Sequence, residues 1–246
     1  MKKSYRFELC AETIQAAIAA EQGGADRIEL CTDLRVGGVT PAPALLAAAL
    51  QHLTIPVHVL IRPRAGDFVY TPEEFVLMGR QIDEAKAAGA AGIAVGILLP
   101  NGRIDVPRTR ELAERARPMH VTFHRAFDEI ANSADASAVA EALENVILTG
   151  ADTLLTSGCA PNVLEGAPTL SRLQLLAGDR IDIMAGGGLR LTNLAEVVNR
   201  SGVTTLHGSL SHRPPAASKE EAQQALVEDI REAIRLLQQE CLETAG

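Results

Sequence analysis

Short apolar runs rich in Val, Ile and Leu alternate along the chain with longer Ala-, Leu-, Glu- and Arg-rich segments of helical spacing. A short apolar run is typical of a buried strand, and a 3.6-residue period is typical of an amphipathic helix. The expected strands lie near Arg6–Cys10, Arg27–Cys31, Val57–Arg62, Gly92–Ile97, His120–His124, Thr153–Thr156, Asp182–Ala185 and Thr205–His207. The expected helices lie near Ala11–Gln22, Pro43–His52, Pro72–Ala88, Pro107–Arg115, Ala134–Leu148, Leu164–Leu176, Leu191–Arg200 and Lys219–Leu242.

Eight strand–helix units of about thirty residues each predict an α/β fold, a (β/α)₈ TIM barrel that forms a single domain over residues 1–246. Glycines such as Gly24, Gly89 and Gly150 follow the expected helices and are typical of helix ends that lead into the next strand. The main alternative is an open, doubly wound sheet, which usually has fewer strands. No G-x-G-x-x-G motif follows the first strand, which also argues against that sheet. We expect no organic cofactor.

The first two strands both end in Glu-Leu-Cys, at residues 8–10 and 29–31. Side chains alternate along a strand, and a barrel of this type carries its active site at the carboxyl ends of the strands. If the leucines face the helices, Glu8 and Glu29 point into the barrel and are candidate catalytic groups. Because buried carboxylates need a partner, the alternative is a structural Glu–Arg pair beneath the site.

The third strand ends in two arginines, Arg62 and Arg64, on either side of Pro63. Guanidinium groups at a stiffened strand end suit a bidentate grip on a carboxylate or phosphate. We therefore expect Arg62 and Arg64 to bind an anionic substrate. The alternative is that one of them neutralises Glu8 or Glu29, and both interpretations can hold together.

The fifth strand ends at His124, a residue type suited to proton transfer near neutral pH. We expect His124 to exchange protons together with Glu8 and Glu29, and the alternative is a satisfied imidazole in the core. Asp128 follows four residues later. It is placed to orient His124 or Arg125, or to cap the next segment.

Glycines follow the seventh strand, and a small polar loop follows the eighth. In TIM barrels this is the usual position of a phosphate-binding site, where backbone N–H groups receive the anion. Gly187, Gly188 and Ser209 are therefore candidate anion-binding residues. The alternative is a tight turn that requires glycine for its positive φ angles.

Composition narrows the possible partners. The chain carries a formal net charge of −8 with no cluster of Lys and Arg, which argues against nucleic acid and against anionic membranes as partners. Apolar residues make up 47% and aromatic residues 3% of the chain, so the core is expected to be aliphatic. The four cysteines are widely spaced, so we expect them to be reduced thiols: Cys10, Cys31, Cys159 and Cys241. Because the sequence shows no signal-peptide pattern, we expect a cytoplasmic location.

Several stretches closely resemble the CutC family of copper homeostasis proteins: Gly24–Cys31, Gly37–Pro41, Ile55–Phe68, Val121–Asp128, Leu155–Gly158 and Ile183–Gly186. The resemblance covers nearly the whole chain and implies a cytoplasmic TIM barrel that forms a homodimer or a higher homo-oligomer and takes part in copper handling. Two positions differ from the family pattern. A Cys-Cys pair is common where this chain has Cys10-Ala11, and His-Ser-Ser is common where it has residues 207–209.

These residues support three hypotheses. Thiolates and imidazoles suit Cu(I), so Cys10 and Cys31 on neighbouring strands are candidate copper ligands, with His58, His124 or His207 nearby. Free cysteines are also common packing residues. The second hypothesis is an enzyme that performs acid–base chemistry on a small phosphorylated or carboxylated molecule. Schiff-base chemistry is disfavoured, because none of the expected strands ends in a lysine. The third is a regulatory binding protein that kept the barrel without catalysis.

Overall fold

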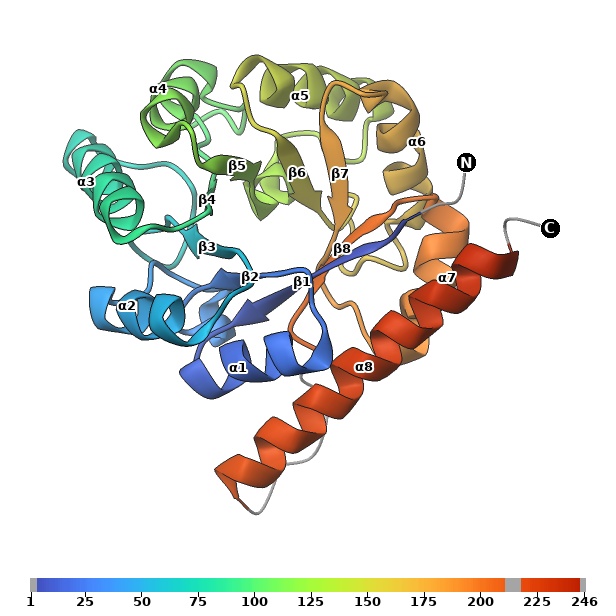
Figure 1. The fold of residues 1–246 in the computed structure, drawn as a ribbon. Coiled ribbons are helices and arrows are strands. Elements are labelled where there is room, and N and C mark those ends of the chain that lie inside the picture. Colours follow the sequence, from blue (N-terminus) through green and yellow to red (C-terminus); the bar gives the residue numbers. More distant parts are fainter. Residues whose placement is uncertain (1–3, 211–217, 244–246) are drawn as a thin grey trace.

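The computed structural model describes residues 4–210 and 218–243, which form a closed barrel of eight parallel strands inside a ring of helices (Figure 1). The strands pair in chain order, and the first closes the barrel by pairing with the last. Their bounds are β1 Arg6–Ala11, β2 Arg27–Leu30, β3 Val57–Leu60, β4 Gly92–Val95, β5 His120–Phe123, β6 Thr153–Thr156, β7 Asp182–Ala185 and β8 Thr205–Gly208. The predicted (β/α)₈ barrel is therefore confirmed, and the open-sheet alternative is wrong.

The helices agree closely with those expected from the hydrophobic period. Their bounds are α1 Ile14–Gly23, α2 Pro43–His52, α3 Pro72–Ala88, α4 Val106–Ala116, α5 Ala136–Leu148, α6 Ala167–Ala177, α7 Leu191–Ser201 and α8 Lys219–Glu243. Local capping sets several of the starts. The Thr71 side chain accepts from the Glu74 N–H, and the Glu74 side chain accepts from the Thr71 N–H, which forms a capping box ahead of Pro72.

Two short 3₁₀ helices were not predicted. They are η1 Leu34–Val36, after β2, and η2 Arg125–Glu129, after β5. Both lie at the carboxyl ends of strands, where hydrophobic periodicity gives no signal because each spans little more than one turn. They shape the rim of the barrel, since η2 begins immediately after His124.

The apolar core lies between the strands and the helices. Leu9 and Leu30 are fully buried there, which confirms that the leucines of both Glu-Leu-Cys segments face outward from the barrel axis. Most of the surrounding side chains are Leu, Ile, Val and Ala, with few aromatic rings among them. The core is therefore aliphatic, as composition predicted.

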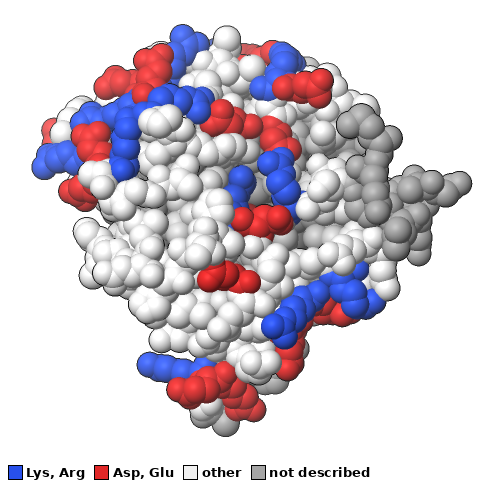
Figure 2. Space-filling model, in the orientation of Figure 1, with Lys and Arg blue, Asp and Glu red and all other residues white. Residues whose placement is uncertain are grey.

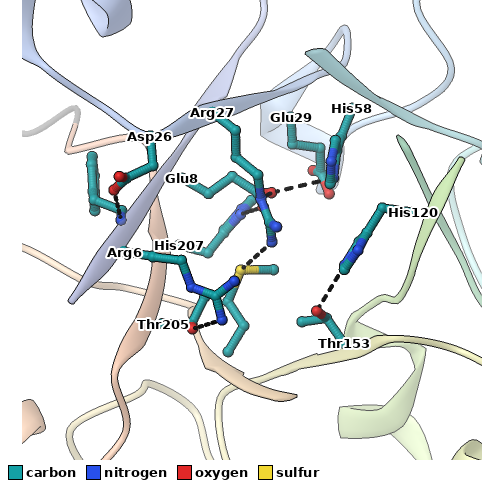
Figure 3. Close-up of polar contacts among 12 residues, drawn as sticks. Arg6, Glu8, Asp26, Arg27, Glu29, His58, His120, Thr153, Thr205 and His207 are labelled. Atoms are coloured by element: carbon teal, nitrogen blue, oxygen red, sulfur yellow. Dashed lines mark hydrogen bonds and ion pairs between the residues drawn. The ribbon is translucent and has the colours of Figure 1, made fainter. Parts of the chain in front are cut away.

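The barrel axis departs from the usual layers of branched aliphatic side chains. Glu8, Arg27, His58 and His207 meet inside the barrel, and His120 hydrogen bonds to Thr153 further along (Figure 3). Because Glu8 is hydrogen-bonded to both Arg27 and His207, the interior can hold this charge with a smaller desolvation penalty.

The surface shows no preference for one sign of charge on the face seen in Figure 2, where Lys and Arg lie beside Asp and Glu. Ion pairs at the surface include Arg115–Asp83 and Arg180–Glu144. No helix in the described part of the chain combines the length and apolar character that a bilayer crossing requires.

Candidate functional site

A cavity of about 960 Å³ lies at the carboxyl ends of the strands. It is lined by seven of the residues selected from the sequence: Cys10, Glu29, Arg62, His124, Gly187, Gly188 and Ser209. Glu29, Arg62 and His124 come from three different strand ends, so strand alternation correctly placed them in one space. Three other selected residues are not part of its lining: Glu8, Cys31 and Arg64.

Glu8 lies deeper along β1 than Cys10 and belongs to an ion-paired cluster (Figure 3). Its carboxylate accepts hydrogen bonds from Arg27 Nε and from His207 Nδ1, the latter at 2.7 Å. Burial raises the pKa of Glu8, but the His207 hydrogen bond and the Arg27 charge outweigh it and lower this pKa to about 2. Glu8 is therefore ionised at neutral pH and forms the structural Glu–Arg pair, which corrects its expected proton-exchange role.

The partner of Glu8 is Arg27, whereas the sequence interpretation had considered Arg62 and Arg64. A signal for Arg27 was present, because residues two apart on a strand point to the same face. Arg27 and Glu29 both lie on β2 with this spacing, so an inward Glu29 implies an inward Arg27. Arg27 is the first residue of β2 and so lies at the end of the strand opposite to the rim, where candidate site residues are expected.

Glu29 forms part of the cavity floor and is almost completely buried. Burial raises its pKa to about 7, with the His207 charge opposing this rise and the Glu8 charge adding to it. The Cys10 thiol donates to Glu29 Oε1 across 3.7 Å. A carboxyl group with this pKa changes its protonation state near neutral pH, which is the property required of a general acid or base.

The two candidate copper ligands lie close together but are not equivalent. Their Sγ atoms are 3.5 Å apart, yet Cys10 lines the cavity and Cys31 does not. Cys10 instead forms a possible metal-binding group with Glu29 and His207. The ligand atoms of these three residues all lie within 4.8 Å of one another. The hydrogen bond with Cys31, burial and the charge of Glu29 all raise the pKa of the Cys10 thiol, so this thiol is protonated at neutral pH.

His207 joins the structural cluster to the cavity floor. Burial opposes its protonation, but the Glu8 hydrogen bond and the charges of Glu29 and Glu8 outweigh burial and raise its pKa. Its Nδ1 is bound to Glu8, and its side chain also lines the cavity. The sequence suggested His207 only as one of several histidines near a copper ion, because its contact with Glu8 depends on the closure of the barrel between β8 and β1.

Arg62 is a buried cation of the cavity wall, with 6% of its surface exposed. Its Nη1 donates to the carbonyls of Val36 and Gly38, and its Nη2 donates to the carbonyl of Gly66. The guanidinium carbon lies 4.8 Å from the centre of the Phe68 ring. Within residues 4–210 and 218–243, no carboxylate lies within ion-pair distance of Arg62, so its charge is held only by neutral groups.

Arg64 does not act beside Arg62, which corrects the expected two-arginine clamp. Its Nε donates to Glu74 at 2.6 Å, and its Nη2 donates to Asp67 at 2.9 Å. Its guanidinium also lies over the Tyr70 ring. Residues two apart after the end of a strand no longer follow the pleat, so the expected common direction of the two arginines was lost in the loop.

His124 is buried at the cavity wall, where its ring lies 5.0 Å from that of Phe68. Its Nδ1 accepts a hydrogen bond from the Ala126 N–H, and its Nε2 has no partner among the described residues. Burial and the charge of Arg62 lower its pKa to about 3. The imidazole is therefore neutral at physiological pH and offers a hydrogen-bond donor, rather than the proton exchange expected from the sequence.

The glycine loop after β7 forms another part of the cavity wall. Gly187 and Gly188 adopt φ angles of 100° and 77°, so the tight-turn interpretation also holds. A Cβ atom at Gly187 would lie 3.0 Å from the guanidinium carbon of Arg125, which packs against this loop. Arg125 and Arg190 both line the cavity and were not selected from the sequence.

Asp128 orients Arg125, one of the roles proposed for it. Its carboxylate accepts from Arg125 Nε at 2.7 Å and from the Ser157 N–H at 3.1 Å. It also accepts from the Thr156 hydroxyl. Asp128 thus ties η2 to the end of β6 and holds Arg125 at the cavity, without contacting His124.

Comparison with known proteins gives a consistent result. A family model described as the CutC family matches residues 5–212. A CutC family protein of Porphyromonas gingivalis is 42% identical over 87% of this chain and 84% of its own length. The human copper homeostasis protein cutC homolog is 42% identical over 83% of this chain and 73% of its own length. The crystal structure of CutC from Streptococcus agalactiae superimposes with a TM-score of 0.77, at 30% identity, over 83% of this chain and 98% of the other.

Proposed function

The chain belongs to the CutC family, and on that premise we propose that it binds one Cu(I) ion as cargo at the floor of the rim cavity. Cys10 and His207 would supply a thiolate and an imidazole, and Glu29 would lie beside them. The observation that supports this site is the distance between the donors, all of which lie within 4.8 Å of one another.

The donor set fits Cu(I) in part. Thiolate and imidazole are soft and intermediate ligands that favour this ion, whereas the Glu29 carboxylate is a hard ligand that does not. We therefore assign the binding to Cys10 and His207. Because the pKa of the Cys10 thiol is raised, copper must displace its proton, and the affinity should increase with pH.

Competition with a chromophoric Cu(I) chelator, under anaerobic and reducing conditions, tests this site. We expect one equivalent of Cu(I) to bind. We expect Cys10→Ser and His207→Gln each to weaken binding at least tenfold, because each removes one of two principal ligands.

Cys159→Ser is the matched control, since Cys159 is a free thiol that does not line the cavity. Cys31→Ser distinguishes the present site from a site shared by both thiols, and we expect a change of less than threefold. Stoichiometric binding that survives both Cys10→Ser and His207→Gln would contradict the proposal.

A second function, binding of a small anionic molecule with proton transfer, is favoured by a different observation. Arg62 is a buried cation without a carboxylate partner among the described residues, and it lines the same cavity as Glu29, whose pKa is about 7. Buried charges normally have a counter-ion, so the cavity suits an anionic ligand. We expect inorganic phosphate and gluconate to raise the Tm, and an unchanged Tm with both would contradict this function.

A further inference from the structure

Two arginines of the cavity lining, Arg62 and Arg190, lie within ion-pair distance of no carboxylate in the described part of the chain. From their placement we infer that the cavity binds a small molecule with two anionic ends, a phosphate at Arg190 and a carboxylate at Arg62. This inference rests on the anion-binding function proposed above, and it specifies the class of ligand.

The two arginines lie on opposite sides of the cavity. Arg62 follows β3 and Arg190 follows β7, and these strands are four positions apart in a closed ring of eight. Strands spaced about 4.8 Å apart and tilted by about 36° close into a barrel roughly 15 Å across. The carbonyls of Val36, Gly38 and Gly66 fix the Arg62 guanidinium on its own side of this ring. A ligand with a charged group at each end therefore suits the two sides better than a single anionic group.

The Arg190 side has the features of a phosphate site. Within residues 4–210 and 218–243, the backbone N–H groups of Gly187 and Gly188 donate to no protein acceptor. The N-terminus of α7 follows directly, with its first residue at Leu191. Free N–H groups, a helix start and the exposed Arg190 guanidinium together favour a dianionic group.

Arg125 strengthens this side. Its guanidinium packs on Gly187, where the φ angle of 100° favours glycine and a Cβ atom would lie 3.0 Å from the guanidinium carbon. Asp128 binds its Nε, and its terminal nitrogens have no hydrogen-bond partner among the described residues. Arg125 is thus held in place by a fixed ion pair at the same loop that offers the free N–H groups.

The Arg62 side suits a planar carboxylate. Three backbone carbonyls fix the guanidinium, and its Nε has no hydrogen-bond partner among the described residues. The uncharged imidazole of His124 lies beside it, and its Nε2 also lacks a partner. Three of the five N–H donors are thus occupied, and the Nε–H and one Nη2–H remain. Two adjacent N–H donors of a rigid guanidinium match the two oxygens of a carboxylate.

The size of the cavity limits the ligand. A volume of about 960 Å³ is near the upper end of small-molecule sites, which span about 300–1,000 Å³. Apolar side chains also line the cavity, among them those of Leu60, Leu155 and Leu189. A six-carbon phosphorylated sugar acid has the required length and charge.

Calorimetric titration of the full, metal-free chain with three probes of matched length tests the inference. The probes are 6-phosphogluconate, which carries both charged ends, sorbitol 6-phosphate, which lacks the carboxylate, and gluconate, which lacks the phosphate. We expect 6-phosphogluconate to bind at least tenfold more tightly than either of the others.

Substitution of each arginine tests which end of the ligand it binds. We expect Arg190→Gln to lower the affinity for both phosphorylated probes at least tenfold and to change the affinity for gluconate less than twofold. We expect Arg62→Gln to lower the affinity for 6-phosphogluconate and for gluconate at least tenfold and to change the affinity for sorbitol 6-phosphate less than twofold. Arg64→Gln is the matched control, since Arg64 does not line the cavity, and it should change no affinity more than twofold.

Arg62 also donates hydrogen bonds to three loop carbonyls, so its removal could disturb the fold. A variant that keeps the positive charge serves as the control for such a defect. Arg62→Lys should retain the preference for 6-phosphogluconate over sorbitol 6-phosphate, at reduced strength. The inference is overturned if 6-phosphogluconate binds no better than sorbitol 6-phosphate, or if both arginine changes weaken all probes equally. The anion-binding function survives those results if binding still depends on Arg190, whereas no binding of any probe contradicts both.

Discussion

At the scale of single residues, two glutamates in the same local sequence have opposite properties. Glu8 and Glu29 each precede Leu-Cys on adjacent inner strands, and both are buried. Glu8 is bonded to Arg27 and His207, which lower its pKa to about 2. Glu29 lacks such an ion pair, so burial dominates and its pKa rises to about 7. One glutamate therefore stabilises the barrel, and the other is suited to chemistry.

This contrast predicts a stability change in Glu29→Gln. An unfolded glutamic acid has its ordinary pKa of 4.5, so between pH 4.5 and 7 the folded protein retains a proton that the unfolded chain has lost. The contribution of Glu29 is therefore complete below pH 4.5 and is lost as the pH rises through 7. We expect Glu29→Gln to increase the free energy of unfolding at pH 8 by on the order of 3 kcal/mol, measured by urea denaturation.

Glu8→Gln provides the matched control with the opposite sign. Its contribution is present above pH 4.5 and is lost as the pH falls towards 2, because its folded pKa is depressed. We expect Glu8→Gln to destabilise the protein at pH 8 by about 3–5 kcal/mol, since it leaves buried cations without their counter-ion. Equal effects of the two substitutions would mean that their environments do not differ as described.

At the scale of secondary-structure elements, β4 makes room for the polar interior. Gly92 pairs in register with His58 on β3 and with His120 on β5, and the two imidazole rings are stacked with their centroids 5.2 Å apart. A Cβ atom at Gly92 would lie 2.6 Å from the His58 ring. Glycine at the start of this strand therefore allows two histidines to meet inside the barrel.

We predict that Gly92→Ala destabilises the protein by about 1–3 kcal/mol, the usual cost of overpacking a core. The substitution should be harmless to the backbone, because Gly92 is not among the glycines with a positive φ angle. Urea denaturation of the double variant Gly92→Ala/His58→Ala tests the cause. If the ring contact is responsible, Gly92→Ala costs less than 1 kcal/mol in the His58→Ala background, and an unchanged cost would contradict it.

At the scale of the whole molecule, the last helix completes the ring. α8 packs against α1, next to the place where β8 pairs with β1 (Figure 1). Ile230 of α8 is fully buried, and a Cβ atom at Gly23 of α1 would lie 2.6 Å from Ile230 Cβ. The glycine thus allows α8 to approach closely, and the first and last parts of the chain support each other.

Ile230→Ala should therefore weaken the entire barrel and not only its last helix. We expect the free energy of unfolding to fall by about 2–4 kcal/mol, because the change leaves a cavity in a closed interface. Urea denaturation followed by circular dichroism should still show one transition. A separate early loss of helical signal, with the main midpoint unchanged, would show that α8 is not part of the cooperative unit.

The sequence by itself determined the class of fold, nearly all the strands and helices, and the direction of inward-facing residues within each strand. These properties follow from local periods of two and 3.6 residues. That information was sufficient to place Glu29, Arg62 and His124 in one cavity. It was not sufficient for Arg64, which lies four residues beyond Leu60, the last residue of β3, and whose guanidinium binds Glu74 and Asp67.

Only the tertiary structure decided which charges are neutralised. The Glu8–His207 hydrogen bond joins the first strand to the last, and the Arg62 guanidinium is held by carbonyls from two separate loops. Ionisation depends on distances of a few ångströms between residues far apart in the chain, and on their burial. Periodicity contains neither quantity, which is why the same Glu-Leu-Cys sequence yields a structural anion on β1 and a titratable acid on β2.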